Sequence, residues 1–243
     1  MLGRKVFTAV EIDGAELKIA VVGRSRRGWE VLTLHRCPGP GLSDWEEGDI
    51  EKAAAGLKAA FKALPGAGKA VITAIDGPRV ILRQLPMPPM PQKELEQAAV
   101  WEAERLLPFP PGEQVVRPVV LGENKNGRQN VLLVAAPKDL VYRYHRIFRR
   151  AGLRLLAVDL QHLALWRVFH GSLGHPVHNG GVRAVLNLGL SFSQFIVLRG
   201  WELVYLRSLP VGLGGVRALS RGTEEATLLI ETAREAAAAE EEE

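Results

Sequence analysis

The chain has 243 residues, 47% of them apolar, which is enough for one large core or two smaller ones. Its apolar runs fall well short of the roughly 18–20 residues that a membrane-spanning helix needs, and its start lacks the apolar core of a signal peptide. The one cysteine, Cys37, excludes an internal disulfide, so we expect a cytosolic protein. The net charge of +4 combines a basic body with an acidic end, because residues 224–243 hold eight Glu and one Arg. The basic residues are scattered and match no nucleic-acid-binding motif, so we expect no nucleic acid partner.

Three strands are predicted near the start of the chain, with Asp13-Gly14 as a tight turn between the first two. The first part of the chain then reads as strands at 6–11, 16–23 and 29–35, a helix at 49–64, and strands at 69–75 and 79–85. The middle part reads as helices at 93–107, 139–151 and 162–169 and strands at 129–136 and 153–159. The last part reads as strands at 184–188, 194–198 and 202–209 and a helix at 224–239. The elements mix helices and strands, so the fold class is α/β.

Two loops rich in proline or glycine divide the predicted elements. "QLPMPPMPQ" (84–92) holds a density of prolines that no helix or central strand tolerates. The second loop spans Gly171–Gly181. Both read as boundaries between structural units.

The chain also contains an internal repeat. "RGWEVLTLHRCP" (27–38) and "RGWELVYLRSLP" (199–210) are identical at six of twelve positions. Upstream of them, residues 11–22 align with residues 187–198 once the longer turn of the first copy is allowed for. Each copy reads as a three-stranded meander followed by helical sequence, which favours a duplicated fold.

Two meander domains facing each other across a cleft resemble the plan of the actin-like ATPases. This resemblance implies an actin-like (ribonuclease H-like) α/β fold, with a complete first domain that carries an insertion and a partial second domain. In that plan, the first turn of each meander binds nucleotide phosphates through backbone N–H groups. An aspartate at the end of the first strand holds Mg²⁺ through water.

Three segments narrow the resemblance to one family. Residues 12–22, 83–110 ("RQLPMPPMPQKELEQAAVWEAERLLPFP") and 130–161 are similar to PilM, the cytoplasmic, FtsA-like assembly protein of type IV pili. The resemblance runs from about residue 6 to 216. It implies a first domain at 1–84 with a return helix and linker at 159–180, an inserted subdomain at 85–158, a partial second domain at 181–230 and an acidic tail at 231–243.

The PilM resemblance implies a protein partner. In that family, a groove between the inserted subdomain and the main first domain receives the N-terminal cytoplasmic tail of PilN, a single-span inner-membrane protein. The chain is then expected to be a cytoplasmic scaffold that meets other platform and motor components and reaches the membrane only through its partner. Whether the chain also forms a homodimer is left open. The candidate partner-binding residues, each of which also fits an ordinary core, are Leu95, Trp101, Leu106, Pro108 and Phe109.

The nucleotide motifs of the family are degenerate in this chain. The residues at the corresponding positions are Glu11, Gly14, Lys18, Asn187, Gly189, Ser191, Ser193 and Gly212. Asp13 stands where the family has glycine, so that a carboxylate would face the phosphates. Asn187 replaces an acidic residue, Ile230 replaces a lysine, and the family continues beyond the point where this chain ends. We therefore expect weak or no ATP binding, no cofactor, no resident metal and no catalytic residue.

Two alternatives stay open. The chain could be a working actin-like ATPase with ATP and Mg²⁺, using Gly189, Ser191 and Ser193 on the phosphates and Glu11 on the metal. It could instead be the related cytoplasmic domain of a type II secretion platform protein.

Overall fold

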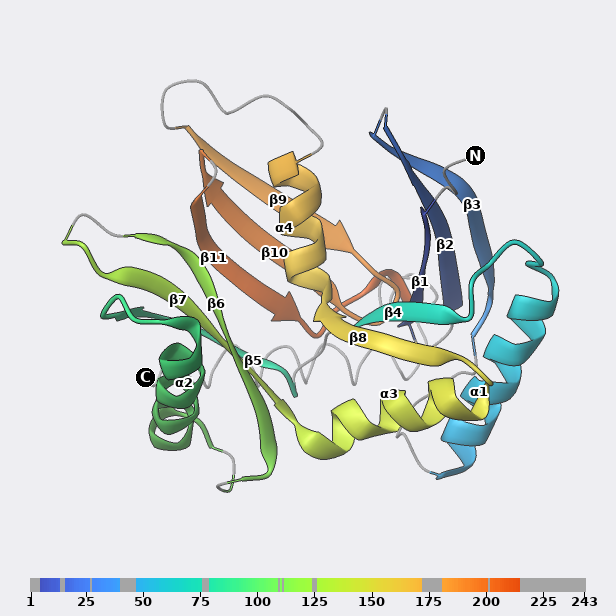
Figure 1. The fold of residues 1–243 in the computed structure, drawn as a ribbon, viewed down its shortest axis with the longest axis horizontal. Helices are drawn as coiled ribbons and strands as arrows, with labels where there is room; N and C mark the ends of the chain where they lie inside the picture. Colours follow the sequence, from blue (N-terminus) through green and yellow to red (C-terminus); the bar gives the residue numbers. More distant parts are fainter. Residues whose placement is uncertain are drawn as a thin grey trace, which may run out of the picture.

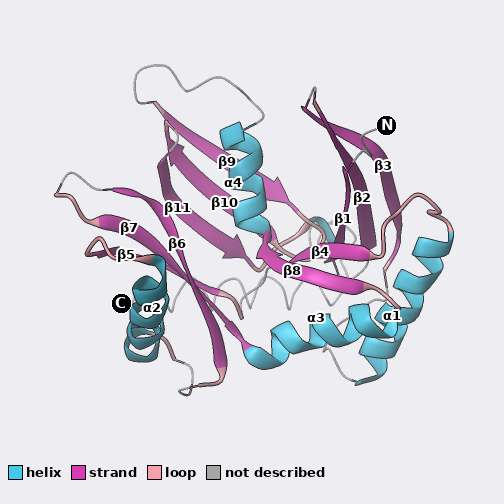
Figure 2. Ribbon diagram, in the orientation of Figure 1, coloured by secondary structure: helices cyan, strands magenta, loops and turns pink. Residues whose placement is uncertain are grey.

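The computed structural model describes residues 5–13, 16–26, 28–39, 47–75, 79–108, 110, 112–123, 126–171, 181–200 and 202–214. Its elements form three sheets with helices packed between and beside them (Figures 1 and 2). The first unit consists of β1 (Lys5–Asp13), β2 (Glu16–Ser25), β3 (Gly28–Pro38), α1 (Glu47–Lys62) and β4 (Ala70–Ile75). The middle consists of β5 (Ile81–Met87), α2 (Gln92–Leu106), β6 (Gln114–Glu123), β7 (Gln129–Pro137), α3 (Lys138–Arg150) and β8 (Arg154–Leu160). The last unit consists of α4 (Gln161–Gly171), β9 (Val182–Leu188), β10 (Ser193–Arg199) and β11 (Glu202–Leu209).

The first sheet has the order β3-β2-β1-β4-β8. β1 runs antiparallel to β2 and parallel to β4, which in turn runs parallel to β8. Alternate residues of β1 and β2 are buried, including Ile12 and Leu17, and they share one core cluster with residues of α1 and α3. Gly56 of α1 faces the sheet, since a Cβ there would lie 3.4 Å from Leu17 Cδ1.

The second sheet is the antiparallel meander β11-β10-β9. One face of this sheet packs against α4, so that Ile196, Leu198 and Leu203 are almost fully buried. These three side chains belong to the same core cluster as the first sheet, which joins the two meanders through a continuous apolar interior.

The two meanders share an irregularity that supports the internal repeat. The pairing of β2 with β3 shifts register between Val21 and Val22. The pairing of β10 with β11 shifts between Val197 and Leu198, which are the aligned positions of the second copy. A β-bulge at the same place in both copies is a specific backbone feature that common strand patterns would not reproduce.

The third sheet has the order β5-β7-β6 and is covered by α2. The sequence did not predict β6, because Pro118 lies within it and proline interrupts the hydrogen bonding of a central strand. Its position at the edge of the sheet explains why proline is tolerated there. The inserted subdomain was expected to span residues 85–158. Its sheet begins earlier, with β5 at Ile81. β8, which starts at Arg154, pairs in the first sheet and not in the inserted one.

Of the helices that the structure describes, none is long and apolar enough to cross a membrane. The predicted helix at 224–239 lies outside the described residues.

Candidate functional site

The first turns of the two meanders touch each other. Asp13 at the end of β1 accepts a hydrogen bond from the backbone N–H of Leu190, in the turn between β9 and β10, at 3.1 Å. The Asp13 side chain is only 11% exposed. Gly189 lies beside this contact, since a Cβ there would be 3.6 Å from Asp13 Oδ2. The Asp13 carboxylate of the first meander is therefore hydrogen-bonded to a backbone N–H in the turn of the second meander.

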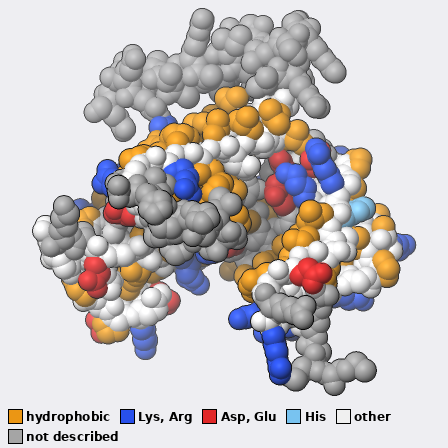
Figure 3. Space-filling view, turned by 90° about the horizontal axis from the view of Figure 1, so that it is seen from above, with side chains coloured by type: hydrophobic (Ala, Val, Ile, Leu, Met, Phe, Trp, Pro, Cys, Tyr) orange, Lys and Arg blue, Asp and Glu red, His pale blue; other side chains and the backbone are white. Residues whose placement is uncertain are grey.

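The acidic and basic side chains of the first turn are paired with one another. Lys18 donates to Glu11 Oε1 at 2.8 Å and lies 3.8 Å from Asp13 Oδ2. Figure 3 shows two masses of side chains with a hollow between them, and acidic and basic side chains lie next to each other beside it. Gly14, another residue predicted for this site, lies outside the described residues.

Asn187 faces a chain of amide groups instead of a charge. Its Nδ2 donates to Gln194 Oε1, and Gln194 Nε2 donates to Gln161 Oε1 at 2.7 Å, at the start of α4. Gln194 is 2% exposed, so this chain lies inside the protein. Buried amides with satisfied partners favour one fixed arrangement of the surrounding elements.

Ser193 and Gly212, two further residues predicted for this site, hold the β9–β10 turn against the segment that follows β11. Ser193 donates its hydroxyl to the Val211 carbonyl at 2.6 Å. Leu213 N–H donates to the Gly189 carbonyl at 2.8 Å. Gly212 is needed for this close approach, because a Cβ there would be 2.2 Å from the carbonyl oxygen of Leu190.

The structure thus brings most of the predicted nucleotide residues together around two touching turns. Ser191 is exposed on the second of these turns. Among the described residues, no group of three or more His, Cys, Asp or Glu side chains is arranged to hold a metal ion.

The residues predicted for partner binding lie on and after α2, away from the first sheet. Leu95 is 1% exposed and packs in the core between α2 and the third sheet, where Leu106 also lies at the edge. Trp101 is 70% exposed on the outside of α2. Pro108 is exposed, and Phe109 lies outside the described residues. The described members of this set do not meet in one groove.

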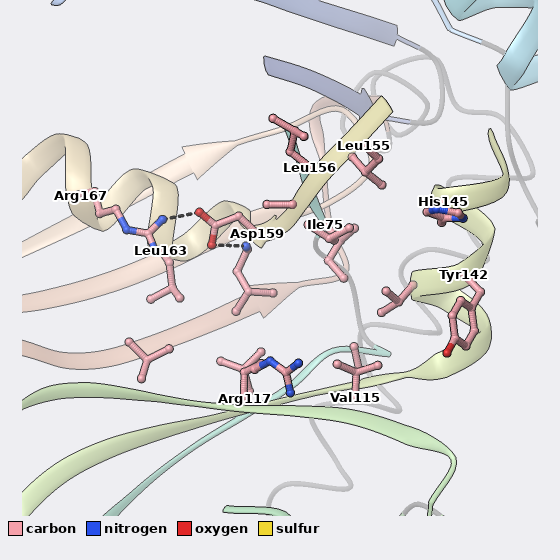
Figure 4. Close-up of a pocket in the computed structure, with 17 residues that line it drawn as sticks. Ile75, Val115, Arg117, Tyr142, His145, Leu155, Leu156, Asp159, Leu163 and Arg167 are labelled. Carbon is pink, nitrogen blue, oxygen red and sulfur yellow. Dashed lines mark hydrogen bonds and ion pairs between the residues drawn. The ribbon is translucent and has the colours of Figure 1, made fainter. Parts of the chain in front are cut away.

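An apolar groove lies instead between the inserted third sheet and the first sheet. It has a volume of about 500 Å³ and is lined by β6 and β7 on one side, β8 and the start of α4 on the other, and α3 at one end. Figure 4 shows Val115 and Arg117 of β6 facing Leu155 and Leu156 of β8 across the opening, with Tyr142 and His145 of α3 beside it. Both β6 and β8 are edge strands of their sheets.

Charged groups lie at intervals along this groove. Arg167 of α4 pairs with Asp159 at the end of β8 (Figure 4). Arg117 donates to the carbonyl of its neighbour Val116 at 2.9 Å, and no acidic partner for it occurs among the described residues. Apart from Tyr142 and His145 at the α3 end, the remaining lining residues are aliphatic. The groove is therefore an apolar channel with a few polar positions, which is typical of ligand and peptide sites.

The sequence did not indicate these groove residues, because they come from three distant segments and one wall is the unpredicted strand β6. Two adjacent leucines on a predicted strand, Leu155 and Leu156, were the one available signal, and the structure places Leu156 exposed and Leu155 half-buried.

Comparisons with known proteins place the fold. A family model described as "Type IV pilus assembly protein PilM" matches residues 10–233. No curated protein matches the chain by sequence. Among solved structures, the PilM–PilN type IV pilus biogenesis complex is similar with a TM-score of 0.77 and 25% identity, over 91% of this chain and 67% of that one.

Two further solved structures are more distant. A Bacteroides thetaiotaomicron protein with an actin-like ATPase fold and unknown function has a TM-score of 0.51 at 13% identity, over 88% of this chain and 74% of that one. The cytoplasmic domain of EpsL, an inner-membrane component of the type II secretion system of Vibrio cholerae, has a TM-score of 0.47 at 14% identity, over 90% and 76%. The actin-like α/β fold expected from the sequence is confirmed.

Proposed function

Because this chain belongs to the family of the type IV pilus assembly protein PilM, we propose that it is a scaffold of pilus assembly that holds the extended N-terminal tail of a PilN-like inner-membrane protein. The observation that carries this proposal is the apolar groove between β8 and β6. The similarity to a solved PilM–PilN complex supports the choice of partner.

The shape of the groove suits an extended peptide. Edge strands present unpaired N–H and C=O groups, and an added strand satisfies them while its alternate side chains enter the pockets beside it. Here β8 supplies one such edge and β6 faces it. Aliphatic residues such as Val115, Leu155 and Leu163 would receive apolar side chains of the tail.

The contact between the two meander turns supports a scaffold over a nucleotide switch. A bound phosphate would need backbone donors such as the N–H of Leu190, which Asp13 already engages. A bound Mg²⁺ would need acidic oxygens, yet Glu11 is paired with Lys18, and Asn187 directs its amide donor at Gln194. These residues do not fit a magnesium-bound phosphate, so we propose weak or absent ATP binding.

The placement at the membrane follows from the partner. A scaffold bound to the tail of an inner-membrane protein would lie on the cytoplasmic side, peripheral to that membrane. Other platform and motor components would then contact its remaining surfaces. The family match to a pilus assembly protein over residues 10–233 favours this system over type II secretion.

Titration of the full chain with a synthetic N-terminal tail of the PilN-like partner tests the groove. Leu156 is 55% exposed on the groove wall, so Leu156→Glu leaves the core intact and places a charge among apolar groups. Burying that charge against an apolar peptide should weaken binding by at least about tenfold. Trp101→Ala is the matched control, because Trp101 is 70% exposed on α2 outside the groove. Loss of binding in Trp101→Ala with full binding in Leu156→Glu would move the partner site to α2 and overturn the proposal.

A further inference from the structure

Basic side chains gather at one end of the first unit, where the C-terminal ends of α1 and α3 meet the starts of β4 and β8 (Figure 1). β4 and β8 are parallel neighbours, so the helices that lead into them end at the same edge of the sheet. The Lys69 carbonyl accepts the Arg154 N–H there at 2.8 Å. The exposed basic residues at this end, which we call the basic face, are Lys58, Lys62, Lys69, Arg149 and Arg154.

The two segments that form this end of the unit contain no acidic residue. Residues 52–75 hold four Lys and residues 140–158 hold five Arg, without an Asp or Glu in either stretch. Arg150 is paired with Glu51 at 2.6 Å, whereas no member of the basic face has an ion pair within the part of the chain that the structure describes. The basic face is therefore a local excess of positive charge.

Stabilisation of the helices accounts for only part of this charge. A basic residue in the last turn of a helix interacts favourably with the partial negative charge of the helix C-terminus, and Lys62 and Arg149 have that position. Lys69 directly precedes β4 and Arg154 begins β8, so both lie outside the helices. Five basic groups at one place, without internal ion pairs, indicate an external partner that carries negative charge.

The basic face borders a hollow with apolar walls. The hollow has a volume of about 390 Å³, and the three lysines of the basic face line it together with half-buried Phe61 and Leu64 and buried Leu153. A phospholipid head group matches both chemistries, because its phosphate pairs with ammonium groups while its glycerol portion contacts apolar side chains. The backbone of a nucleic acid would use the lysines but not the apolar walls, so the hollow favours a lipid.

The basic face is continuous with the end of the groove between β6 and β8. α3 places Tyr142 and His145 at the groove and Arg149 one turn further along the same side of the helix. Leu155 lines the groove directly after Arg154. Under the proposed function, on which this step rests, the groove holds the tail of an inner-membrane protein and keeps the chain close to the bilayer. Anionic lipids attract clustered Lys and Arg within a Debye length of about 10 Å.

We propose that the basic face binds anionic phospholipid head groups and holds this end of the first unit against the bilayer surface. The ammonium and guanidinium groups pair with lipid phosphates, and the apolar hollow receives the glycerol portion of one lipid. This contact is additional to the one made through the protein partner, so the chain meets the membrane at two places. Two linked contacts bind more tightly than either does alone, and together they fix the orientation of the chain beneath the bilayer.

Co-sedimentation of the full chain with lipid vesicles, without any tail peptide, tests this contact. The vesicles consist of phosphatidylcholine alone or of phosphatidylcholine mixed with phosphatidylglycerol. Lys58→Glu with Lys69→Glu reverses two charges of the basic face, and both side chains are exposed. The matched control is Lys93→Glu with Arg199→Glu, which reverses two exposed basic residues outside the basic face and changes the net charge equally.

The parent chain and the control should bind the anionic vesicles and not the neutral ones. Lys58→Glu with Lys69→Glu should bind the anionic vesicles at least about tenfold more weakly, and added salt should weaken binding of the parent. Arg149→Gln with Arg154→Gln should also weaken binding, and it serves as the test should the first variant not fold.

Three outcomes would overturn the inference. They are absence of binding to anionic vesicles at low salt, equal binding to neutral and anionic vesicles, and equal binding of the basic-face and control variants. Binding of a short DNA duplex through the same lysines, without vesicle binding, would assign the basic face to nucleic acid instead. The tail titration stays a separate test, because Lys58 and Lys69 lie outside the groove, so failure of one contact is distinguishable from failure of the other.

Discussion

Replacing Asp13 with alanine should loosen the contact between the two meanders. The Asp13 carboxylate is 11% exposed and accepts the Leu190 N–H at 3.1 Å. A hydrogen bond to a charged group contributes about 1.5–3 kcal/mol, and the substitution also leaves the Leu190 N–H without this acceptor. For a chain of this size, a loss of about 2 kcal/mol lowers the Tm by about 4–8 °C.

Thermal unfolding and amide hydrogen exchange together measure this effect. Asp13→Ala should lower the Tm and accelerate exchange of the Leu190 amide, because local opening of the turn becomes easier. Glu202→Ala is the control, since Glu202 is an exposed carboxylate at the start of β11 with no ion pair among the described residues. A Tm within about 1 °C of the parent, with unchanged exchange at Leu190, would refute the reasoning about this contact.

Two further predictions concern the close contact between Gly212 and Leu190 and the pH dependence of stability at Asp139. Gly212→Ala should destabilise the fold by about 1–3 kcal/mol, because its Cβ would be 2.2 Å from the Leu190 carbonyl oxygen. The control is Gly48→Ala in α1, which has open space around it and should be neutral or slightly stabilising. Denaturant titration measures both variants. Burial raises the pKa of Asp139, but the hydrogen bonds and charge of Arg79 outweigh it and hold that pKa below its usual value. A lowered folded-state pKa stabilises the fold above the unfolded value of about 3.9 and ceases to do so as the pH falls through the folded value. Asp139→Asn should therefore lower the Tm slightly at pH 7, and the difference from the parent should disappear in acid.

The sequence predicted the elements whose residues carry a regular pattern. The meander strands alternate apolar and polar residues, and the Asp13-Gly14 turn separates two of them, so local chemistry was sufficient there. β6 was missed because Pro118 breaks the pattern and only its edge position makes that proline acceptable.

The sites were harder to predict than the strands. The sequence placed a carboxylate in the first turn but could not show that Asp13 would engage Leu190, which lies far along the chain. Trp101 and Leu95 were plausible partner contacts by type, yet the first lies outside the groove and the second is buried in the core under α2. The groove depends on how two sheets approach each other, and local patterns do not encode that distance.

Calorimetric titration of the full chain with ATP, with and without Mg²⁺, tests the scaffold proposal most directly. Asp13 already accepts the Leu190 N–H, and Glu11 is paired with Lys18. We therefore expect no binding heat at ATP concentrations up to about 1 mM, which means a binding free energy weaker than about −4 kcal/mol. Mg²⁺-dependent binding tighter than about 100 µM would contradict the account and make the protein a nucleotide switch.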